Sequence, residues 1–222
     1  MYNNIINFGG QAEQDKFVLN ITNFKKNGYF LELGSGQPCG GGNNTYCLEK
    51  EFDWRGISID KEGNKQEALD YKNKRPNSIY YKANALSLNY IDILKNSPKN
   101  IDYLQIDLHV DDNSTLNLLL KMDKEILDKY KFATITFEHD YYMSKNNNDI
   151  WSITRKISRE IFKKRGYVLI FPDVQLPSNT YHLGIQCGKF EDWYVHPELV
   201  DKDIIEKYKT DKSLFFKDIK YN

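Results

Sequence analysis

Short apolar runs alternate with amphipathic helical patterns along the chain. Runs rich in β-branched and aromatic residues predict seven strands, of which the last is the weakest. They lie at 29–33, 55–60, 79–83, 101–106, 132–137, 166–171 (ended by Pro172) and 192–195. Apolar residues at 3.6-residue spacing predict helices at 15–26, 114–127 and 151–164. This alternation is typical of βα units, so the sequence predicts an α/β fold with a doubly wound, seven-stranded, mostly parallel sheet.

The apolar stripes of the three predicted helices are assigned to core packing rather than to a ligand. Phe24 belongs to the first stripe and Leu120 to the second, for which Ser114 is the expected N-cap. In the third helix, isoleucines form the buried stripe, and the basic residues are expected on the opposite, solvent-facing side.

Composition narrows the kinds of protein that fit. The length of 222 residues predicts one domain over 1–222, with an N-terminal helical segment at 1–27 and the sheet-containing core at 28–222. The 31 basic residues balance 31 acidic ones, which removes the electrostatic argument for a binder of nucleic acid or anionic membrane. No apolar run reaches the roughly 18–20 residues of a membrane span, and the first residues do not resemble a signal peptide, so we expect a cytoplasmic protein. The cysteines form no CxxC pair and are expected to be free thiols: Cys39, Cys47 and Cys187.

Candidate chemistry begins where the first predicted strand ends, in residues 32–36 (ELGSG). Open α/β sheets bind their ligands at this edge, and two glycines let the backbone turn sharply and approach a ligand closely. A dinucleotide site would need G-x-G-x-x-G leading into a helix, but Cys39 occupies the third position and Pro38 interrupts the run. A nicotinamide oxidoreductase is therefore the less favoured interpretation.

An acid two residues before the first glycine suits an ammonium group better than a phosphate. Glu32 therefore points to S-adenosylmethionine (SAM) as the cofactor. Asp60 ends the second predicted strand, where a carboxylate can accept hydrogen bonds from both ribose hydroxyls. Asn84 and Ala85 follow the third strand and suit an adenine ring. The alternatives are a glycine-rich turn without a ligand and, for Asp60, a helix N-cap or an exposed acid.

Six further segments, in their order and spacing, resemble one known family. They are residues 11–18 (QAEQDKFV), 28–34 (GYFLELG), 43–50 (NNTYCLEK), 54–57 (WRGI), 137–140 (FEHD) and 191–197 (EDWYVHP). The family is that of the FkbM-type SAM-dependent methyltransferases, and the resemblance covers most of the chain. It implies a Rossmann-like class I methyltransferase fold and methyl transfer from SAM to a hydroxyl oxygen, often of a sugar or glycan. The residues expected around the donor are Glu32, Gly34, Ser35, Gly36, Asn44, Asp60, Asn84, Ala85 and Asp107.

One position departs from the family's pattern. After the fourth strand the family commonly has Asp-x-Glu-Gly, whereas this chain has residues 107–110 (DLHV). A hydroxyl acceptor has to lose a proton, so we expect His109 to be the catalytic base, with Asp107 positioning it or contacting the donor, and His139 as the second candidate. No metal site is predicted, although Asp107, His109, Asp111 and His139 are an alternative divalent-metal set. A second alternative is a binding module that kept the fold but lost its base.

The acceptor is expected to be a small molecule or a carbohydrate. Residues 141–143 (YYM) and the Asn-rich segment 145–148 could form an aromatic platform and a polar lid over a sugar, or they could anchor the next helix. Three arginines nearby could meet an acidic acceptor or form a charged outer helix face: Arg155, Arg159 and Arg165.

Overall fold

The computed structural model describes residues 6–62, 65–176 and 188–221. The strands are β1 (Tyr29–Leu33), β2 (Arg55–Asp60), β3 (Ser78–Lys82), β4 (Asn100–Ile106), β5 (Lys131–Glu138), β6 (Val168–Gln175) and β7 (Lys189–Val195). The α-helices are α1 (Gln14–Ile21), α2 (Tyr46–Phe52), α3 (Lys65–Lys74), α4 (Tyr90–Ile93), α5 (Ser114–Glu125), α6 (Ile150–Lys164) and α7 (Lys202–Tyr208). Short 3₁₀ turns are η1 (Ala85–Ser87), η2 (Tyr141–Met143) and η4 (Phe216–Asp218).

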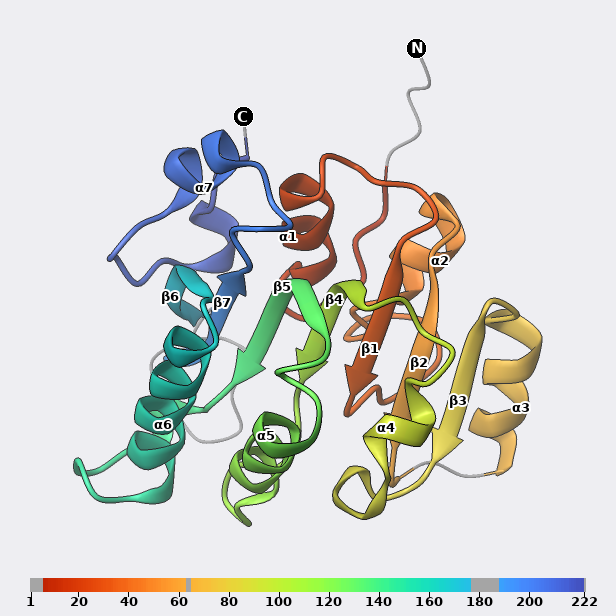
Figure 1. Cartoon of the computed structure of the whole chain (residues 1–222), viewed down its shortest axis with the longest axis horizontal. Coiled ribbons are helices and arrows are strands. Elements are labelled where there is room, and N and C mark those ends of the chain that lie inside the picture. The colour runs from red at the N-terminus through yellow and green to blue at the C-terminus, as the bar shows by residue number, and fades with distance from the viewer. Residues whose placement is uncertain (1–5, 63–64, 177–187, 222) are drawn as a thin grey trace.

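The seven strands form one sheet in the order β3-β2-β1-β4-β5-β7-β6 (Figure 1). Strands β1 to β5 are mutually parallel, and β7 is antiparallel to both of its neighbours, β5 and β6. The chain winds outward from β1 to β3 and then resumes at β4 on the other side of β1. The loops after β1 and β4 therefore diverge at the carboxyl edge of the sheet, which is where such folds bind ligands. The predicted doubly wound, mostly parallel, seven-stranded sheet is confirmed.

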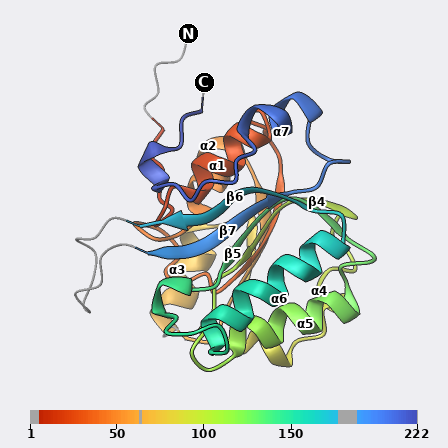
Figure 2. The same ribbon diagram turned by 90° about the vertical axis from the view of Figure 1, so that its left-hand side faces the viewer.

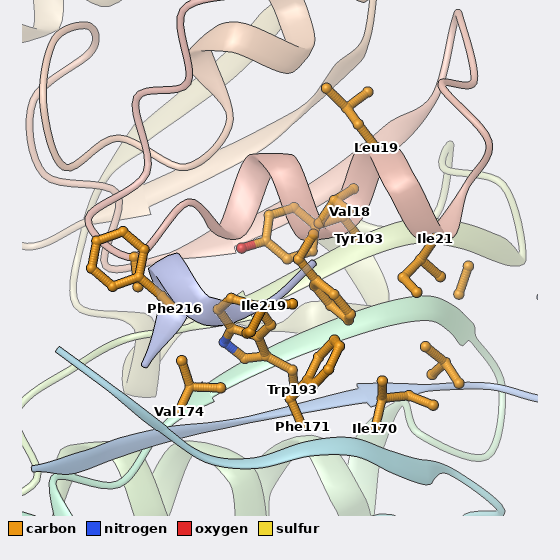
Figure 3. Packing of buried hydrophobic residues seen from close by; sticks show 14 of the residues in the cluster. Val18, Leu19, Ile21, Tyr103, Ile170, Phe171, Val174, Trp193, Phe216 and Ile219 are labelled. Carbon is orange, nitrogen blue, oxygen red and sulfur yellow. The ribbon is translucent and has the colours of Figure 1, made fainter. Parts of the chain in front are cut away.

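Helices cover both faces of this sheet (Figure 2). Helices α1, α2 and α7 lie on one face, and α4, α5 and α6 lie on the other. On the first face, Phe17 of α1 packs against Trp193 of β7, with ring centroids 4.7 Å apart, and against Phe171 of β6 at 6.0 Å. Figure 3 shows Trp193 and Phe171 pointing from the sheet toward α1. On the other face, Phe162 of α6 packs edge-on against Phe137 of β5, so each face has its own buried aromatic cluster.

Two of the predicted helices differ from their expected form. Helix α1 ends at Ile21 instead of residue 26, because the following residues adopt left-handed conformations, among them Phe24 with a φ of 52°. Phe24 is consequently 43% exposed and does not belong to the buried stripe. In α5, Leu120 is 46% exposed, and Ser114 is the first helical residue and not the N-cap.

Strand β6 passes through Pro172, where the sequence predicted its end. The strand lies at the edge of the sheet, where proline is tolerated because one side of the strand needs no ladder hydrogen bonds. The register against β7 shifts between Phe171 and Val174, and Asp173 within this irregularity has a φ of 53°. Strand β7 also begins earlier than predicted, at Lys189.

None of the helices within the described ranges has the length and apolarity needed to cross a membrane. Cys39 and Cys47 are free thiols, as predicted. Cys187 lies outside the described residues.

Candidate active site

A cavity of about 680 Å³ opens at the carboxyl ends of the parallel strands. Its walls come mainly from the loops that follow β1 to β5, with Gln11 from the N-terminal segment and Trp151 from α6. Of the residues predicted around the donor, six line it: Gly34, Gly36, Asp60, Asn84, Ala85 and Asp107. The structure therefore brings together, around one cavity, residues from four separate βα loops.

Gly34 is required by the close approach of two loops. Its φ is +85°, and a Cβ atom built on it would lie 1.6 Å from the Asp107 carbonyl oxygen. The Gly34 N–H donates to Ile59 O at 2.9 Å, so the turn after β1 is wedged between β2 and β4. Only glycine combines this φ with this lack of space.

Asp60 and Asn84, which the sequence assigns to the ribose and the adenine of SAM, lie at the β2 and β3 ends of the cavity. The Gly36 N–H donates to Asp60 Oδ2 at 2.8 Å, and the Glu62 N–H donates to Asp60 Oδ1 at 2.7 Å. Each carboxylate oxygen keeps further acceptor capacity. Asn84 Oδ1 accepts the Leu86 N–H at 3.0 Å and so caps η1, and its amide nitrogen makes no hydrogen bond within the described residues.

Three of the residues predicted to contact SAM do not line the cavity. Glu32 is fully buried within β1, where its Oε2 accepts hydrogen bonds from Thr45 at 2.9 Å and Ser58 at 2.6 Å. Burial raises the pKa of Glu32. Ser35 and Asn44 are also buried, at 3% and 1% exposure, outside the cavity lining. The structure does not bring the side chains of these three residues to the cavity wall, because strand and helix packing cover them.

Glu32 belongs to a buried network around Arg75, to which Thr45 connects it. The buried Arg75 guanidinium pairs with Glu49 (Nε to Oε2, 2.6 Å) and donates to Thr45 Oγ1 at 2.8 Å and to the Pro38 carbonyl at 3.0 Å. Thr45 in turn donates to Glu32. The network connects α2, the start of β3 and the glycine-rich segment after β1. Glu32 therefore stabilises that segment from the buried side, away from the cavity.

Three carboxyl groups converge at the β4 and β5 end of the cavity: Asp107, Glu138 and Asp140, which we call the acid corner. Burial raises the pKa of all three, and for Glu138 the neighbouring Asp107 and Asp140 carboxylates add to a large upward shift. Gln105 Nε2 donates to Asp107 Oδ2 at 3.2 Å. Like charges this close do not all ionise together, so the acid corner retains a proton at a pH where isolated carboxyls have lost theirs.

The two predicted bases occupy different surroundings. His109 lines the cavity, but its side chain is 58% exposed and lies at the lip, with Nε2 3.6 Å from Glu62 Oε1. Its imidazole therefore lies near Glu62, which follows β2. His139 is fully buried and does not line the cavity, so its prediction as an alternative base is wrong. Its Nε2 lies 3.5 Å from Asp192 Oδ1 and 3.7 Å from Asp173 Oδ1.

The structure does not bring the alternative set of metal ligands together, because His139 lies outside the cavity. His139 faces away from the cavity, so it cannot share an ion with Asp107 and His109. Among the described residues the single grouping close enough for a metal is His139, Asp173 and Asp192. Both of its carboxylates already make two-point ion pairs, with Arg155 and Arg159. The arginines therefore already neutralise the charge that a metal ion would neutralise.

The predicted acceptor platform is only partly present. Tyr142 and Met143 line the cavity beside Trp151. Tyr141 instead lies under the Arg155 guanidinium, 4.4 Å from its centre, and the Asn-rich segment 145–148 is not part of the lining.

The three arginines are also not available to an acidic acceptor. Arg155 and Arg159 turn toward buried carboxylates of the sheet, and Arg165 pairs with Asp123 at 2.5 Å. They therefore do not form the solvent-facing side of the helix either.

Sequence reasoning missed several residues of this site. The sequence places Glu138 and Asp140 on the rim but assigns them no role beside His139, and the alternation of side chains beyond β5 was the signal that could have selected them. Gln11 reaches the cavity because the segment before α1 is fastened in place. Asp15 Oδ2 accepts the N–H groups of Gly9 at 2.6 Å and Gly10 at 3.3 Å.

No protein-family model and no curated protein matches the chain. Several solved structures do resemble it. The O-methyltransferase TomG from Streptomyces achromogenes, in complex with SAM, gives a TM-score of 0.52 at 12% identity, over 85% of this chain and 82% of that chain. A putative SAM-dependent methyltransferase from Listeria monocytogenes gives 0.51 at 11% identity, over 82% and 97%.

The 1,6-didemethyltoxoflavin-N1-methyltransferase from Burkholderia thailandensis gives a TM-score of 0.50 at 9% identity, over 82% of this chain and 76% of that chain. At such low identity, likeness establishes the fold. Together with the strand order, it shows that the chain has the Rossmann-like class I methyltransferase fold.

Proposed function

We propose that the chain is a single-domain SAM-dependent methyltransferase. The observation that carries this proposal is the charge of the cavity, whose described lining residues include seven carboxyl side chains and one lysine, Lys61. SAM carries a sulfonium and an ammonium group, so an acidic cavity attracts it and repels phosphates. A nicotinamide dinucleotide is disfavoured by the same charge. It is also disfavoured because α2 begins only at Tyr46 and not directly after Gly36, where a pyrophosphate needs a helix N-terminus.

The lining residues fit the parts of this donor. Asp60 has acceptor capacity left for ribose hydroxyls, and the Asn84 amide nitrogen can donate to an adenine ring beside Ala85. Asp107 suits the ammonium group. When bound, SAM supplies an activated methyl group that a nucleophile takes by in-line displacement. The protein's part is to align the nucleophile and to remove its proton.

For the proton we propose Glu138, acting with Asp107 and Asp140. Burial and the neighbouring carboxylates raise the pKa of Glu138, which makes its ionised form a stronger base for the acceptor's proton. His109 is less well placed for this step, because it lies at the lip beside Glu62. We propose that it flanks the nucleoside part of the donor instead.

For the acceptor we propose the hydroxyl of a sugar or glycan, in keeping with the resemblance to FkbM-type methyltransferases. Tyr142 and Trp151 line the cavity as aromatic residues on which a sugar can stack, and the acid corner can accept hydrogen bonds from its hydroxyls. Transfer to an amine nitrogen is the second candidate, because three carboxyls also suit a cationic acceptor. A protein that binds SAM without turning over any acceptor would instead support the binding-module alternative.

The experiment that tests the function is isothermal titration with SAM and with S-adenosylhomocysteine (SAH). We expect both to bind to the wild-type protein. Asp60→Ala should weaken binding about tenfold or more, since the Gly36 N–H and the ribose contacts are lost together. Asp128→Ala, an exposed carboxylate after α5, is the matched control and should bind as the wild type does. Absence of binding by either ligand at millimolar concentration would contradict the proposal.

A further inference from the structure

Asp140 holds its place in the acid corner through an unusual backbone conformation. Its φ is 49° and its ψ is 36°, in the left-handed region that non-glycine residues rarely adopt. Here the chain leaves β5 and turns into η2, which carries Tyr142 and Met143 into the cavity wall. Such a conformation persists where neighbouring structure enforces it.

Contacts of His139, on the buried side of the turn, stabilise this conformation of Asp140. The N–H groups of His139 and Asp140 both donate to the Phe190 carbonyl, at 2.8 and 2.9 Å. The His139 Nδ1 accepts the Tyr141 N–H at 3.1 Å, so the imidazole spans the turn. With Nδ1 as an acceptor, the neutral ring carries its proton on Nε2, which points toward Asp192 and Asp173.

A buried ion-pair network lies beside this imidazole, with its carboxylate oxygens 3.5 and 3.7 Å from Nε2. Arg159 binds Asp192 through Nε and Nη2, both at 2.7 Å, and Arg155 binds Asp173 through the same atoms, both at 2.6 Å. The Asp173 N–H donates to Asp192 Oδ1 at 2.8 Å. Although burial opposes it, His139 and Arg159 hold the pKa of Asp192 well below its usual range.

The network also reaches the turn directly. Arg155 covers the ring of Tyr141, 4.4 Å from its centre, while it pairs with Asp173. Helix α6 and strands β6 and β7 are thus connected to both residues that flank Asp140. Among the described residues that line the cavity, none belongs to the ion-pair network itself, so the turn is its route to the site.

We propose that His139 is a positioning residue: together with the buried Arg155, Asp173, Arg159 and Asp192 network, it fixes Asp140 against Glu138 and so sets the charge of the acid corner that receives the cationic donor. The inference rests on the proposed function, since it concerns how the cavity binds SAM. It gives the buried histidine a role other than that of a base.

The consequence is a pH dependence of SAM affinity. Asp140 faces Glu138, Asp107 and His139 and is hydrogen-bonded by Tyr142. From β7, the buried Glu191 lies opposite Glu138 in the strand register. Moving Asp140 away removes one of the carboxylates that raise the pKa of Glu138. The acid corner should then lose its proton at lower pH, and the pH at which SAM affinity rises should fall with it.

The test measures the SAM dissociation constant by isothermal titration across the pH range for four proteins: wild type, Asp140→Asn, His139→Leu and His196→Leu. His196 is a matched control, since it is also buried (4% exposed) but lies outside the cavity lining, where its Nδ1 accepts the Glu198 N–H. We expect His139→Leu to lower the midpoint by about one pH unit or more, toward the midpoint of Asp140→Asn. His196→Leu should keep the wild-type midpoint.

Each outcome decides between the two proposals. A folded His139→Leu protein with the wild-type midpoint would overturn the positioning role. If His139→Leu does not fold, Arg155→Lys replaces it, because lysine keeps the charge but loses the two-point pair and the planar contact with Tyr141. An unchanged midpoint in Arg155→Lys would overturn the role equally. If the wild-type protein does not bind SAM at any pH, the proposed function fails instead.

Discussion

Asp15 offers a quantitative prediction, because a buried carboxyl there fastens the N-terminal segment beside the cavity. It is fully buried and accepts backbone N–H groups from Gly9, Gly10 and Lys16. Burial raises its pKa from the ordinary value of 3.8 to about 6. The folded protein therefore holds this proton up to about pH 6, while the unfolded chain releases it near pH 4.

The sign and size of the effect follow from proton linkage. Between these two pKa values the unfolded state has lost a proton that the folded state keeps, so stability falls as the pH rises and then levels off above pH 6. A difference of about two units corresponds to about 3 kcal/mol in total, of which about 2 kcal/mol falls between pH 4.5 and pH 7.5.

The assay is urea unfolding followed by tryptophan fluorescence at pH 4.5 and pH 7.5, for wild type and Asp15→Asn. Asparagine cannot ionise, and it leaves one N–H group unpaired at a pH-independent cost of about 1–3 kcal/mol. The stability of wild type minus that of the variant should therefore fall by about 2 kcal/mol from the lower to the higher pH. Asp128→Asn is the exposed control. A difference that stays constant within about 0.5 kcal/mol would refute the reasoning.

Three further changes test the site. Gly34→Ala should abolish SAM binding and lower the melting temperature, because its Cβ has no room, whereas Gly41→Ala, with nothing within 4 Å, should leave both unchanged. Arg75→Lys keeps the charge but loses most of the buried hydrogen bonds, and should cost about 3 kcal/mol or more in urea unfolding; a loss below about 1 kcal/mol would contradict the network. Glu138→Gln should slow methyl transfer about 10²–10⁴-fold at saturating SAM, measured as SAH release, and a larger loss from His109→Ala would return the base to the histidine.

Much of the fold could be predicted because it depends on patterns that are local in the sequence. Buried parallel strands are mostly apolar, so runs such as those of β1 and β4 stand out without any knowledge of their neighbours. Asp60, Asn84 and Asp107 could be placed at the cavity for a related reason. Each lies at the end of a strand or within two residues after it, and parallel strands end at one edge of the sheet.

The errors arose where the direction of a side chain decides the outcome. Glu32 lies inside β1 and not after it, so packing between β2 and β4 buries it on one face of the sheet. Glu138, His139 and Asp140 are consecutive, and successive side chains of an extended chain point to opposite sides. Glu138 and Asp140 can share the cavity, whereas His139 is directed to the buried network.

The arginines of α6 were misassigned because their partners are distant in the sequence. A charged side chain at helical spacing is usually solvent-exposed, and periodicity alone favours that interpretation. Arg155 and Arg159 instead meet Asp173 and Asp192, which β6 and β7 bring beneath the helix. Long-range pairing of this kind depends on the order of strands at the antiparallel edge of the sheet.

The most direct test of the account is a crystal structure of the complex with SAH. The account predicts that the adenosine lies between Asp60 and Asn84, with the amino-acid end of SAH beside Asp107. Glu138 should then remain open to an acceptor on the side of Trp151. SAH bound outside this cavity, or an empty cavity in crystals grown at saturating SAH, would contradict the central claim.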